Sequence, residues 1–351
     1  MLGFDSTRRI SIQQSHTIAR ERSDAVMNRR AFLQTVPALA FADPLVAMAQ
    51  PAAKVRRIGM LTAGTVSTSE PRAFYAALRD LGWIEGENII IERRGAAGKS
   101  EAMPALAADL VRLNPDVITA GGAVAGVAAK NATTTIPIVA VNGDPVRLGL
   151  VSSMSHPDGN ITGISLISPE LAAKRLEILR EMVPKATRAG EIVDRANQYW
   201  YRVRDDYERA FELLRLQPIF IEIASSDAIP AAIAEIANRR ADALIVRGDP
   251  MLASNREQIA RLALQYKLPT IAEERPFSEA GLLLSYGSDP RAVARRSAAI
   301  VDRILRGAKP GDIPLEQPTK FELVINLKTA RSLGLTIPQS LLRRADDTIP
   351  E

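Results

Sequence analysis

The sequence contains no cysteine among its 351 residues and only two histidines, His16 and His156. Without cysteine, the chain forms no disulfide, no thiolate metal site, no cysteine nucleophile and no cysteine-linked lipid anchor. Two histidines far apart in sequence argue equally against a histidine-based triad or a multi-histidine metal site. We therefore predict that the protein is not an enzyme and has no catalytic residues, no metal and no cofactor.

Aromatic residues and excess charge are also scarce. Aromatics make up 5% of the chain and the formal net charge is only +5. Residues 1–50 hold six arginines against four acidic residues, so about +3 remains for the rest of the chain. So small and scattered a charge does not favour a nucleic-acid partner. The length and the 46% hydrophobic content predict two globular domains.

The N-terminal 50 residues have the pattern of a cleavable export signal. Arg29-Arg30 precedes a mostly apolar segment at 35–48, and Ala47-Met48-Ala49 has the small-x-small form of a cleavage site. The paired arginines resemble the twin-arginine export signal, although the general secretory route stays open. Met27 is an alternative start to Met1, and a disordered tail is the alternative to a signal. We predict a leader over 1–50 and a periplasmic location.

The next hundred residues alternate apolar runs with amphipathic segments. Strands are predicted at 56–61, 88–92, 116–119 and 136–141, with helices ending at Gly82, at 101–113 and after Gly122. This order predicts a parallel, doubly wound sheet, whose ligands bind at the carboxyl ends of the strands.

The same alternation begins again after residue 164. Strands are predicted at 189–193, 218–223, 241–246, 268–271, 282–285 and 321–325, and a long helix at 290–305. We predict an α/β fold of two doubly wound parallel-sheet lobes joined by a multi-crossing hinge. Lobe one comprises 55–163 plus about 288–316, and lobe two comprises 164–287 plus about 320–345.

Lobe one offers polar groups after its strands. Thr62, Thr65 and Ser67 follow the first strand, and their hydroxyl and N–H groups suit a carboxylate; alternatively, Ser67 only caps the next helix. Gly121-Gly122 lacks the spacing of a dinucleotide loop and predicts a helix N-terminus offering N–H groups to a polar ligand. Asp144 follows the fourth strand and binds a ligand ammonium or hydroxyl group, or only forms a turn with Pro145.

Lobe two offers acids and aromatics in the corresponding places. Asp249 and Glu273 follow predicted strands, and Asn197 lies in the loop after 189–193. The only aromatic cluster, Tyr199-Trp200-Tyr201, lies in the same region, and we predict Trp200 as a stacking platform for the ligand. The alternative is that the cluster packs within its own lobe.

Several stretches carry a resemblance to a known family. They are Asp144–Val146 with Gly149–Val151, Gly159–Gly163, Leu284–Gly287, Pro310–Pro314, and Glu316–Ala330 continuing through Gly334–Pro338. These stretches resemble ABC-transporter substrate-binding proteins of the tryptophan/tyrosine-binding-like type, over about residues 55–348. The resemblance implies a type I periplasmic-binding-protein fold, and its characterised members bind aromatic amino acids. The loop at 194–201 departs from the Asn-x-x-Glu/Ala-Asn-Ser pattern often found in the family.

The function that we predict is capture of a small solute between the lobes. The resemblance implies an exported subunit of an ABC importer, with a permease and an ATPase as partners and with membrane contact only through the permease. The solute is expected to carry a carboxylate or an aromatic body. A ligand-sensing partner of a membrane receptor is the alternative. A nucleotide-dependent enzyme is a less favoured alternative, because the chain lacks the fingerprint glycines of a dinucleotide site. A transcription regulator is disfavoured because it would need a helix-turn-helix in residues 1–50, where the paired arginines and the apolar segment lie.

Overall fold

The structure is a computed structural model that describes residues 54–65, 72–166 and 169–350. The predicted leader and Ser67 lie outside these ranges. Among the described residues, no helix combines the length and the apolar character needed to cross a membrane.

The first sheet contains five parallel strands in the order β2-β1-β3-β4-β5. The strands are β1 (Arg56–Thr62), β2 (Ile89–Gly95), β3 (Val117–Gly121), β4 (Ile138–Asn142) and β5 (Ile161–Ser165). The helices that cover it are α1 (Arg72–Asp80), α2 (Met103–Arg112), α3 (Ala123–Ala132) and α10 (Pro290–Leu305). We call this sheet and its helices lobe one.

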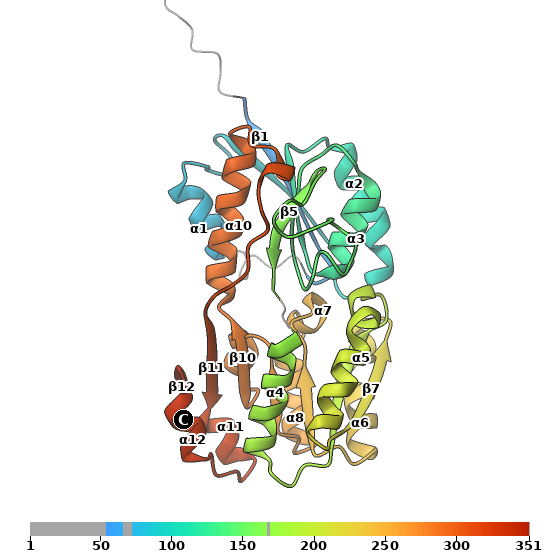
Figure 1. Ribbon diagram of the computed structural model, residues 1–351, viewed down its shortest axis with the longest axis vertical. Helices are drawn as coiled ribbons and strands as arrows, with labels where there is room; N and C mark the ends of the chain where they lie inside the picture. Colours follow the sequence, from blue (N-terminus) through green and yellow to red (C-terminus); the bar gives the residue numbers. More distant parts are fainter. Residues whose placement is uncertain (1–53, 66–71, 167–168, 351) are drawn as a thin grey trace, which may run out of the picture. The chain divides into compact units, whose positions relative to one another are not determined.

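The two faces of this sheet carry separate apolar cores. Leu61 and Ile118 pack with Met103 and Leu110 of α2 on one face, together with alanines of α3. On the other face, α1 and α10 pack against Ile58, Val117 and Val139. Figure 1 shows α10 beside α1, although the two helices come from distant parts of the chain. The Trp83 indole after α1 donates to Asp302 on α10 over 2.7 Å and fastens this pair.

The second sheet contains seven strands in the order β12-β11-β10-β9-β8-β6-β7. The strands are β6 (Arg188–Asp194), β7 (Gln217–Ile223), β8 (Ala243–Val246), β9 (Thr270–Ala272), β10 (Leu284–Ser288), β11 (Phe321–Asn326) and β12 (Asp347–Ile349). The helices are α4 (Pro169–Met182), α5 (Gln198–Leu213), α6 (Ile229–Asn238), α7 (Pro250–Ala253), α8 (Arg256–Gln265), α9 (Arg275–Glu279), α11 (Leu327–Ser332) and α12 (Gln339–Arg344). We call this sheet and its helices lobe two.

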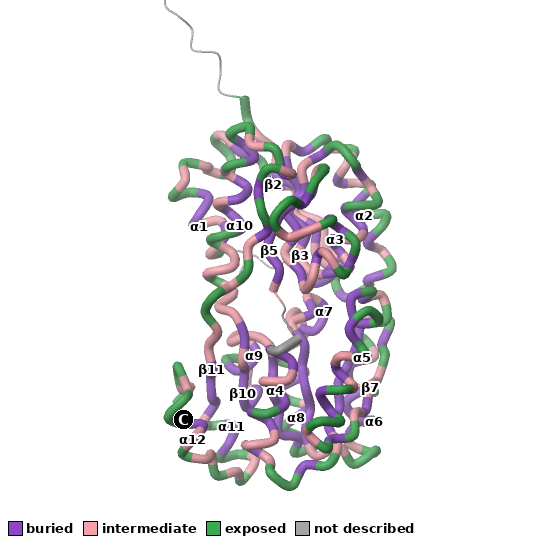
Figure 2. Tube along the Cα trace, viewed as in Figure 1, coloured by how far each residue is buried: buried purple, intermediate pink, exposed green. Residues whose placement is uncertain are grey.

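Lobe two is likewise covered on both faces. Helices α4 and α5 pack on one face of its sheet, and α6, α8 and α9 pack on the other. The central strands are buried along their length in Figure 2, while the outer faces of the helices are exposed. Strands buried on both faces are typical of parallel sheets between helical layers. The predicted α/β alternation is therefore confirmed in both lobes.

One pair of strands in lobe two is antiparallel, in contrast to the predicted parallel sheet. Leu284 of β10 lies opposite Ile325 of β11, and Ser288 lies opposite Phe321. The reason is the path of the chain. Strand β10 leads out of lobe two into α10 of lobe one, and β11 begins where the chain returns. The two neighbouring strands therefore start at opposite ends of the sheet, and β12 then pairs with β11 in parallel.

The chain passes between the lobes three times within residues 54–350. The connections follow β5, β10 and the short 3₁₀ turn Pro310–Asp312. Residues of the third connection run beside the first, since Glu316 forms a bridge with Ile164. Strand β5 ends at Ser165, so it crosses the predicted boundary at residue 163.

Candidate ligand-binding site

A cavity of about 210 Å³ lies at the carboxyl ends of strands from both lobes; we call it the polar cavity. Lobe one contributes Gly121, Gly122, Val141 and Asn142 from the ends of β3 and β4, and lobe two contributes Arg175, Asn197, Arg247, Asp249 and Glu273. In parallel sheets the strand ends leave backbone and side-chain groups free to meet a ligand.

Direct contacts join the two lobes around this cavity. The Ser100 hydroxyl of lobe one donates to the Asp194 carboxylate of lobe two over 2.6 Å, and this bond is buried. The Thr65 N–H donates to the Ser254 hydroxyl over 2.9 Å. Gly122 lies so close to lobe two that a Cβ there would be 2.7 Å from Pro250 Cγ, and its φ of 88° also requires glycine.

Arg175 is a buried cation in the wall of the polar cavity. It lies on α4, its side chain is 5% exposed, and its Nη1 donates to Glu273 Oε1 over 2.9 Å. Its Nε donates to the Tyr286 carbonyl over 2.9 Å. Burial alone would raise the pKa of Glu273, but Arg175, Arg247 and the Gly248 N–H outweigh it and lower the pKa. Glu273 therefore stays ionised beside the cavity.

Arg247 is a second buried cation of the same wall. Its Nη1 donates to Glu191 Oε1 over 2.9 Å, and its guanidinium carbon lies 4.6 Å from the Tyr207 ring centroid and 5.3 Å from the Trp200 ring centroid. These contacts with the rings hold the guanidinium group in place. No hydrogen bond from its other nitrogens to a described residue is found, which leaves them available to an anion in the cavity.

Asn142 is the most informative residue of the lobe-one wall. It ends β4, is 2% exposed, and neither its Nδ2 nor its Oδ1 has a hydrogen-bond partner among the described residues. A buried polar group without a partner costs about 1–3 kcal/mol, so it needs a reason. Beside it, Gly122 begins α3 without a side-chain cap, so the first N–H groups of this helix lack an intrahelical partner. The N–H groups at the start of α3 suit a polar ligand, whereas the Asn142 amide is enclosed beside Gly126, where an added Cβ would lie 2.7 Å from its Nδ2.

Asp249 is a buried acid on the opposite wall. It caps α7, since its Oδ1 accepts from the Met251 N–H over 2.9 Å, and its Oδ2 accepts from Asn197 Nδ2 over 3.3 Å. Burial, with the neighbouring Asp194 carboxylate, raises the pKa of Asp249 from 3.8 to about 6. Burial also raises the pKa of Asp194. Strongly shifted acids in a cleft are typical of functional sites.

This shift predicts that the charge of Asp249 destabilises the fold. Since the folded protein binds this proton more tightly than the unfolded chain, stability is lost as the pH rises from about 4 to the folded pKa of about 6. Asp249→Asn keeps the helix cap and removes the charge, so it should raise the free energy of unfolding at pH 7 by about 1–3 kcal/mol. Urea denaturation at pH 4 and pH 7 measures the difference.

A matched control for this variant is Asp289→Asn. Asp289 caps α10 through the Arg291 N–H in the same way, but its side chain is 39% exposed. It should leave the free energy of unfolding at pH 7 within about 1 kcal/mol of the wild type. Equal stabilities of Asp249→Asn and the wild type at pH 7 would contradict the prediction.

The structure brings five of the predicted site residues together. Gly121, Gly122, Asn197, Asp249 and Glu273 line the polar cavity. Thr62 and Thr65 line a neighbouring chamber in lobe one. Ser67 lies outside the described residues. Asp144 lines neither space, because its carboxylate accepts from the Val146 and Arg147 N–H groups and forms the turn that was the alternative prediction.

Trp200 is part of the apolar core and does not line the polar cavity. It is 0% exposed, and its ring packs edge-to-face with Phe220 at 4.6 Å and with Tyr207 at 5.6 Å between centroids. Asn197 caps α5 by accepting from the Tyr199 N–H, so the predicted loop is already the first turn of a helix. This turn directs Trp200 inward, whereas Tyr201 is 47% exposed.

The lining residues that the sequence prediction missed include Asn142, Arg175 and Arg247. Each carries a signal in the sequence. Asn142 and Arg247 come directly after buried β-branched strands, where ligand groups are expected. Arg175 lies four residues from both Leu171 and Leu179, so it is a charged residue on the apolar face of its helix.

Comparisons with known proteins show what this chain is similar to. Residues 68–349 match the sequence profile of the family described as ABC transporter substrate binding protein. The chain is 29% identical over 267 residues to a tyrosine-binding protein of Clostridioides difficile (strain R20291), covering 75% of this chain and 76% of the relative.

Solved structures show the same fold. A conserved domain protein of Vibrio cholerae O1 biovar eltor is similar with a TM-score of 0.77 and 26% identity, over 84% of this chain and all of the other. An ABC domain from Streptococcus pneumonia in complex with L-Trp is similar with a TM-score of 0.74 and 23% identity, over 84% of this chain and 99% of the other. These similarities confirm the predicted fold of two α/β lobes.

Proposed function

This chain belongs to the ABC transporter substrate binding protein family, and on that basis we propose that it captures a small aromatic solute with a carboxylate for an ABC importer. Arg175 and Arg247 supply buried guanidinium nitrogens for a carboxylate, which planar guanidinium groups bind well. Asp249 and Glu273 supply acceptors for an ammonium group. Such a pairing of buried charges suits the two ends of a zwitterion.

The observation that carries the proposal is the unpartnered amide of Asn142. Asn142 borders the polar cavity, and its amide donor and acceptor are enclosed beside Gly126 without a partner among the described residues. If the side chain turns toward the cavity, a ligand with a donor and an acceptor of its own would satisfy both at once. The tyrosine-binding relative and the L-Trp complex support an aromatic α-amino acid as this ligand.

The test replaces Asn142 by leucine, which has a similar shape and no polar atoms. The dissociation constants for L-tyrosine and L-tryptophan, measured by calorimetry, should rise about 10- to 100-fold, as expected for a lost hydrogen bond to a charged group. The free energy of unfolding without ligand should stay equal or increase, because the variant removes two unsatisfied buried atoms.

Asn160→Leu is the matched control. Asn160 directly precedes β5 in lobe one, and its Nδ2 already donates to the Ile136 carbonyl over 2.8 Å. This variant should lose stability and keep its affinity. If Asn142→Leu binds both amino acids as well as the wild type does, the proposed site is wrong.

The proposal includes a hinged closure of the lobes and delivery of the solute to a permease with its ATPase, with membrane contact only through the permease. A ligand-sensing role beside a membrane receptor would use the same cavity. Uptake of radiolabelled tyrosine by cells that lack the gene separates the two: unchanged uptake would favour sensing. We infer no catalytic role and no nucleic-acid partner.

We also propose that residues 1–50 direct export to the periplasm, by the twin-arginine route through Arg29-Arg30. The family works outside the cytoplasm, and the small-x-small pattern Ala47-Met48-Ala49 supports cleavage after Ala49. N-terminal sequencing of the exported protein checks the cleavage site. Finding full-length precursor there would contradict it.

A further inference from the structure

A second cavity of about 300 Å³ lies within lobe one, next to the polar cavity; we call it the lobe-one chamber. Its walls come from β1, α1 and α10, and include Met60, Phe74, Tyr75, Val293, Ala294 and Ser297. It shares Gly121 and Val141 with the polar cavity, so the two spaces meet at the ends of β3 and β4. The buried charged residues of the polar cavity do not line this chamber.

The walls of the lobe-one chamber are mostly apolar and are held in place. Phe74 is buried and packs edge-to-face with Tyr75 at 6.0 Å between centroids. The Tyr75 hydroxyl accepts from Arg93 Nε over 2.8 Å, and the Arg93 guanidinium carbon lies 4.9 Å from the Tyr75 ring centroid. These contacts fix the aromatic wall, so the chamber is largely formed before anything binds.

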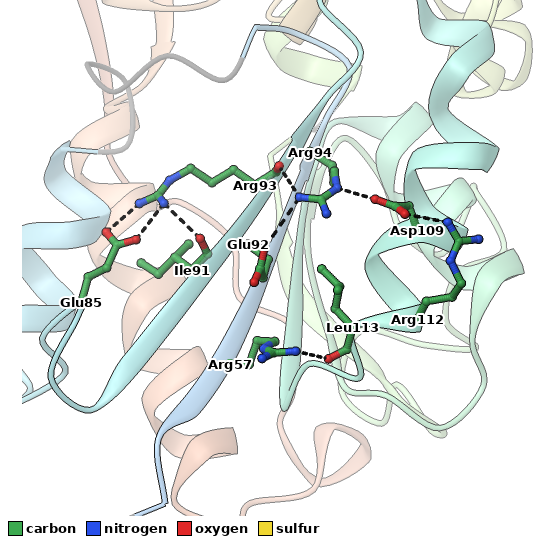
Figure 3. A network of polar contacts seen from close by, with 9 residues as sticks. All are labelled: Arg57, Glu85, Ile91, Glu92, Arg93, Arg94, Asp109, Arg112 and Leu113. Carbon is green, nitrogen blue, oxygen red and sulfur yellow. Dashed lines mark hydrogen bonds and ion pairs between the residues drawn. The ribbon is translucent and has the colours of Figure 1, made fainter.

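The one charged residue of this lining is already neutralised. Arg94 donates from its Nε to Asp109 Oδ2 over 2.7 Å, as Figure 3 shows, and Asp109 also pairs with Arg112. Ser297 is different: it is 5% exposed, and no described residue forms a hydrogen bond with its hydroxyl. With Thr62 and Thr65 as further hydroxyl groups of the wall, the chamber suits a mostly apolar body.

We propose that the lobe-one chamber holds the apolar, ring-bearing part of the solute, while its charged end lies in the polar cavity. This inference rests on the proposed function and adds the orientation of the ligand. It assigns recognition of the apolar body to α1 and α10 of lobe one rather than to the aromatic cluster around Trp200.

The polar cavity and a third space beside it suit an apolar body less well than the chamber does. The polar cavity itself is walled by Arg175, Arg247, Asp249 and Glu273, and a third space beside it is lined by Arg275, Arg291, Asp289 and Glu279. An aromatic ring placed against these charged groups would displace their hydrating water without offering hydrogen bonds in return, which costs free energy. Among these three neighbouring spaces, the chamber has the fewest charged lining residues, whereas the polar cavity combines Leu166, Leu171 and Tyr199 with its charged groups.

The experiment fills the chamber from α10. Ser297→Leu and Ala294→Leu each add a branched apolar side chain to the wall, and Ala299→Leu is the matched control on the same helix, because Ala299 lines neither cavity. Calorimetry with L-tryptophan and L-tyrosine should show about a tenfold or greater loss of affinity for both filled variants. The control should stay within about twofold of the wild type.

The outcomes separate this inference from the proposed function. If the wild type binds neither amino acid, the proposed aromatic amino-acid ligand is wrong. If the wild type binds and both filled variants keep its affinity, the chamber assignment is wrong. A crystal structure of the wild type with L-tryptophan decides the assignment even where a variant fails to fold. Contact of the indole with Phe74 and Val293 supports it, and an indole outside the chamber overturns it.

Discussion

Arg175→Met is expected to lower the free energy of unfolding by about 3–5 kcal/mol, the usual cost of removing one partner of a buried ion pair. The variant leaves the Glu273 carboxylate without its cation and the Tyr286 carbonyl without its donor. Because a protonated Glu273 no longer needs a cation, the loss should be smaller at pH 4 than at pH 7. Urea denaturation at both pH values measures it.

Lys174→Met is the control for this variant. Lys174 is the preceding residue on α4, and its ion pair with Glu177 is solvent-exposed, with side chains 43% and 52% exposed. Exposed pairs contribute about 0–1 kcal/mol, so this variant should be close to the wild type. If the two variants lose the same stability, the buried pair has no special role in holding the site.

Trp200→Ala is the second variant with a large expected effect, a loss of about 3–5 kcal/mol in the free energy of unfolding. Trp200 is among the largest fully buried side chains, and its removal leaves a cavity beside Phe220. It also removes the ring on which the Arg247 guanidinium group lies. Thermal and urea denaturation without ligand measure the loss.

Tyr201→Ala tests the neighbouring aromatic residue. Tyr201 is 47% exposed and donates to Glu222 over 3.1 Å at the surface, so its loss should cost under about 1 kcal/mol. A stable Trp200→Ala that no longer binds L-tryptophan would instead restore the stacking platform predicted from the sequence.

The prediction that Trp200 contacts the ligand shows the limit of inference from a local sequence pattern. From the sequence, the aromatic cluster is predicted to lie in the loop after residues 189–193. The apolar positions Trp200, Val203, Tyr207 and Phe211 already have helical spacing and form the buried face of α5. If the helix is extended back to Asn197, a good N-cap residue, the same spacing predicts that Trp200 faces the core.

The sequence by itself determined the features that depend on neighbours along the chain. Buried β-branched runs and amphipathic segments specified the strands and helices of two α/β lobes, since these patterns follow the periods of each element. Because ligands bind at the carboxyl ends of parallel strands, the same patterns placed Gly121, Gly122, Asp249 and Glu273 at one site.

Only the tertiary structure decided which distant groups meet. Arg175 pairs with Glu273 across 98 residues, and the lobe-one chamber forms because α10 returns to pack beside α1. Asn142 lies beside Gly126 of α3, where neither of its amide atoms has a partner among the described residues. The pairing of charges, the burial of side chains and the shape of a cavity depend on the whole fold. A local sequence pattern does not specify which distant surfaces an element will contact.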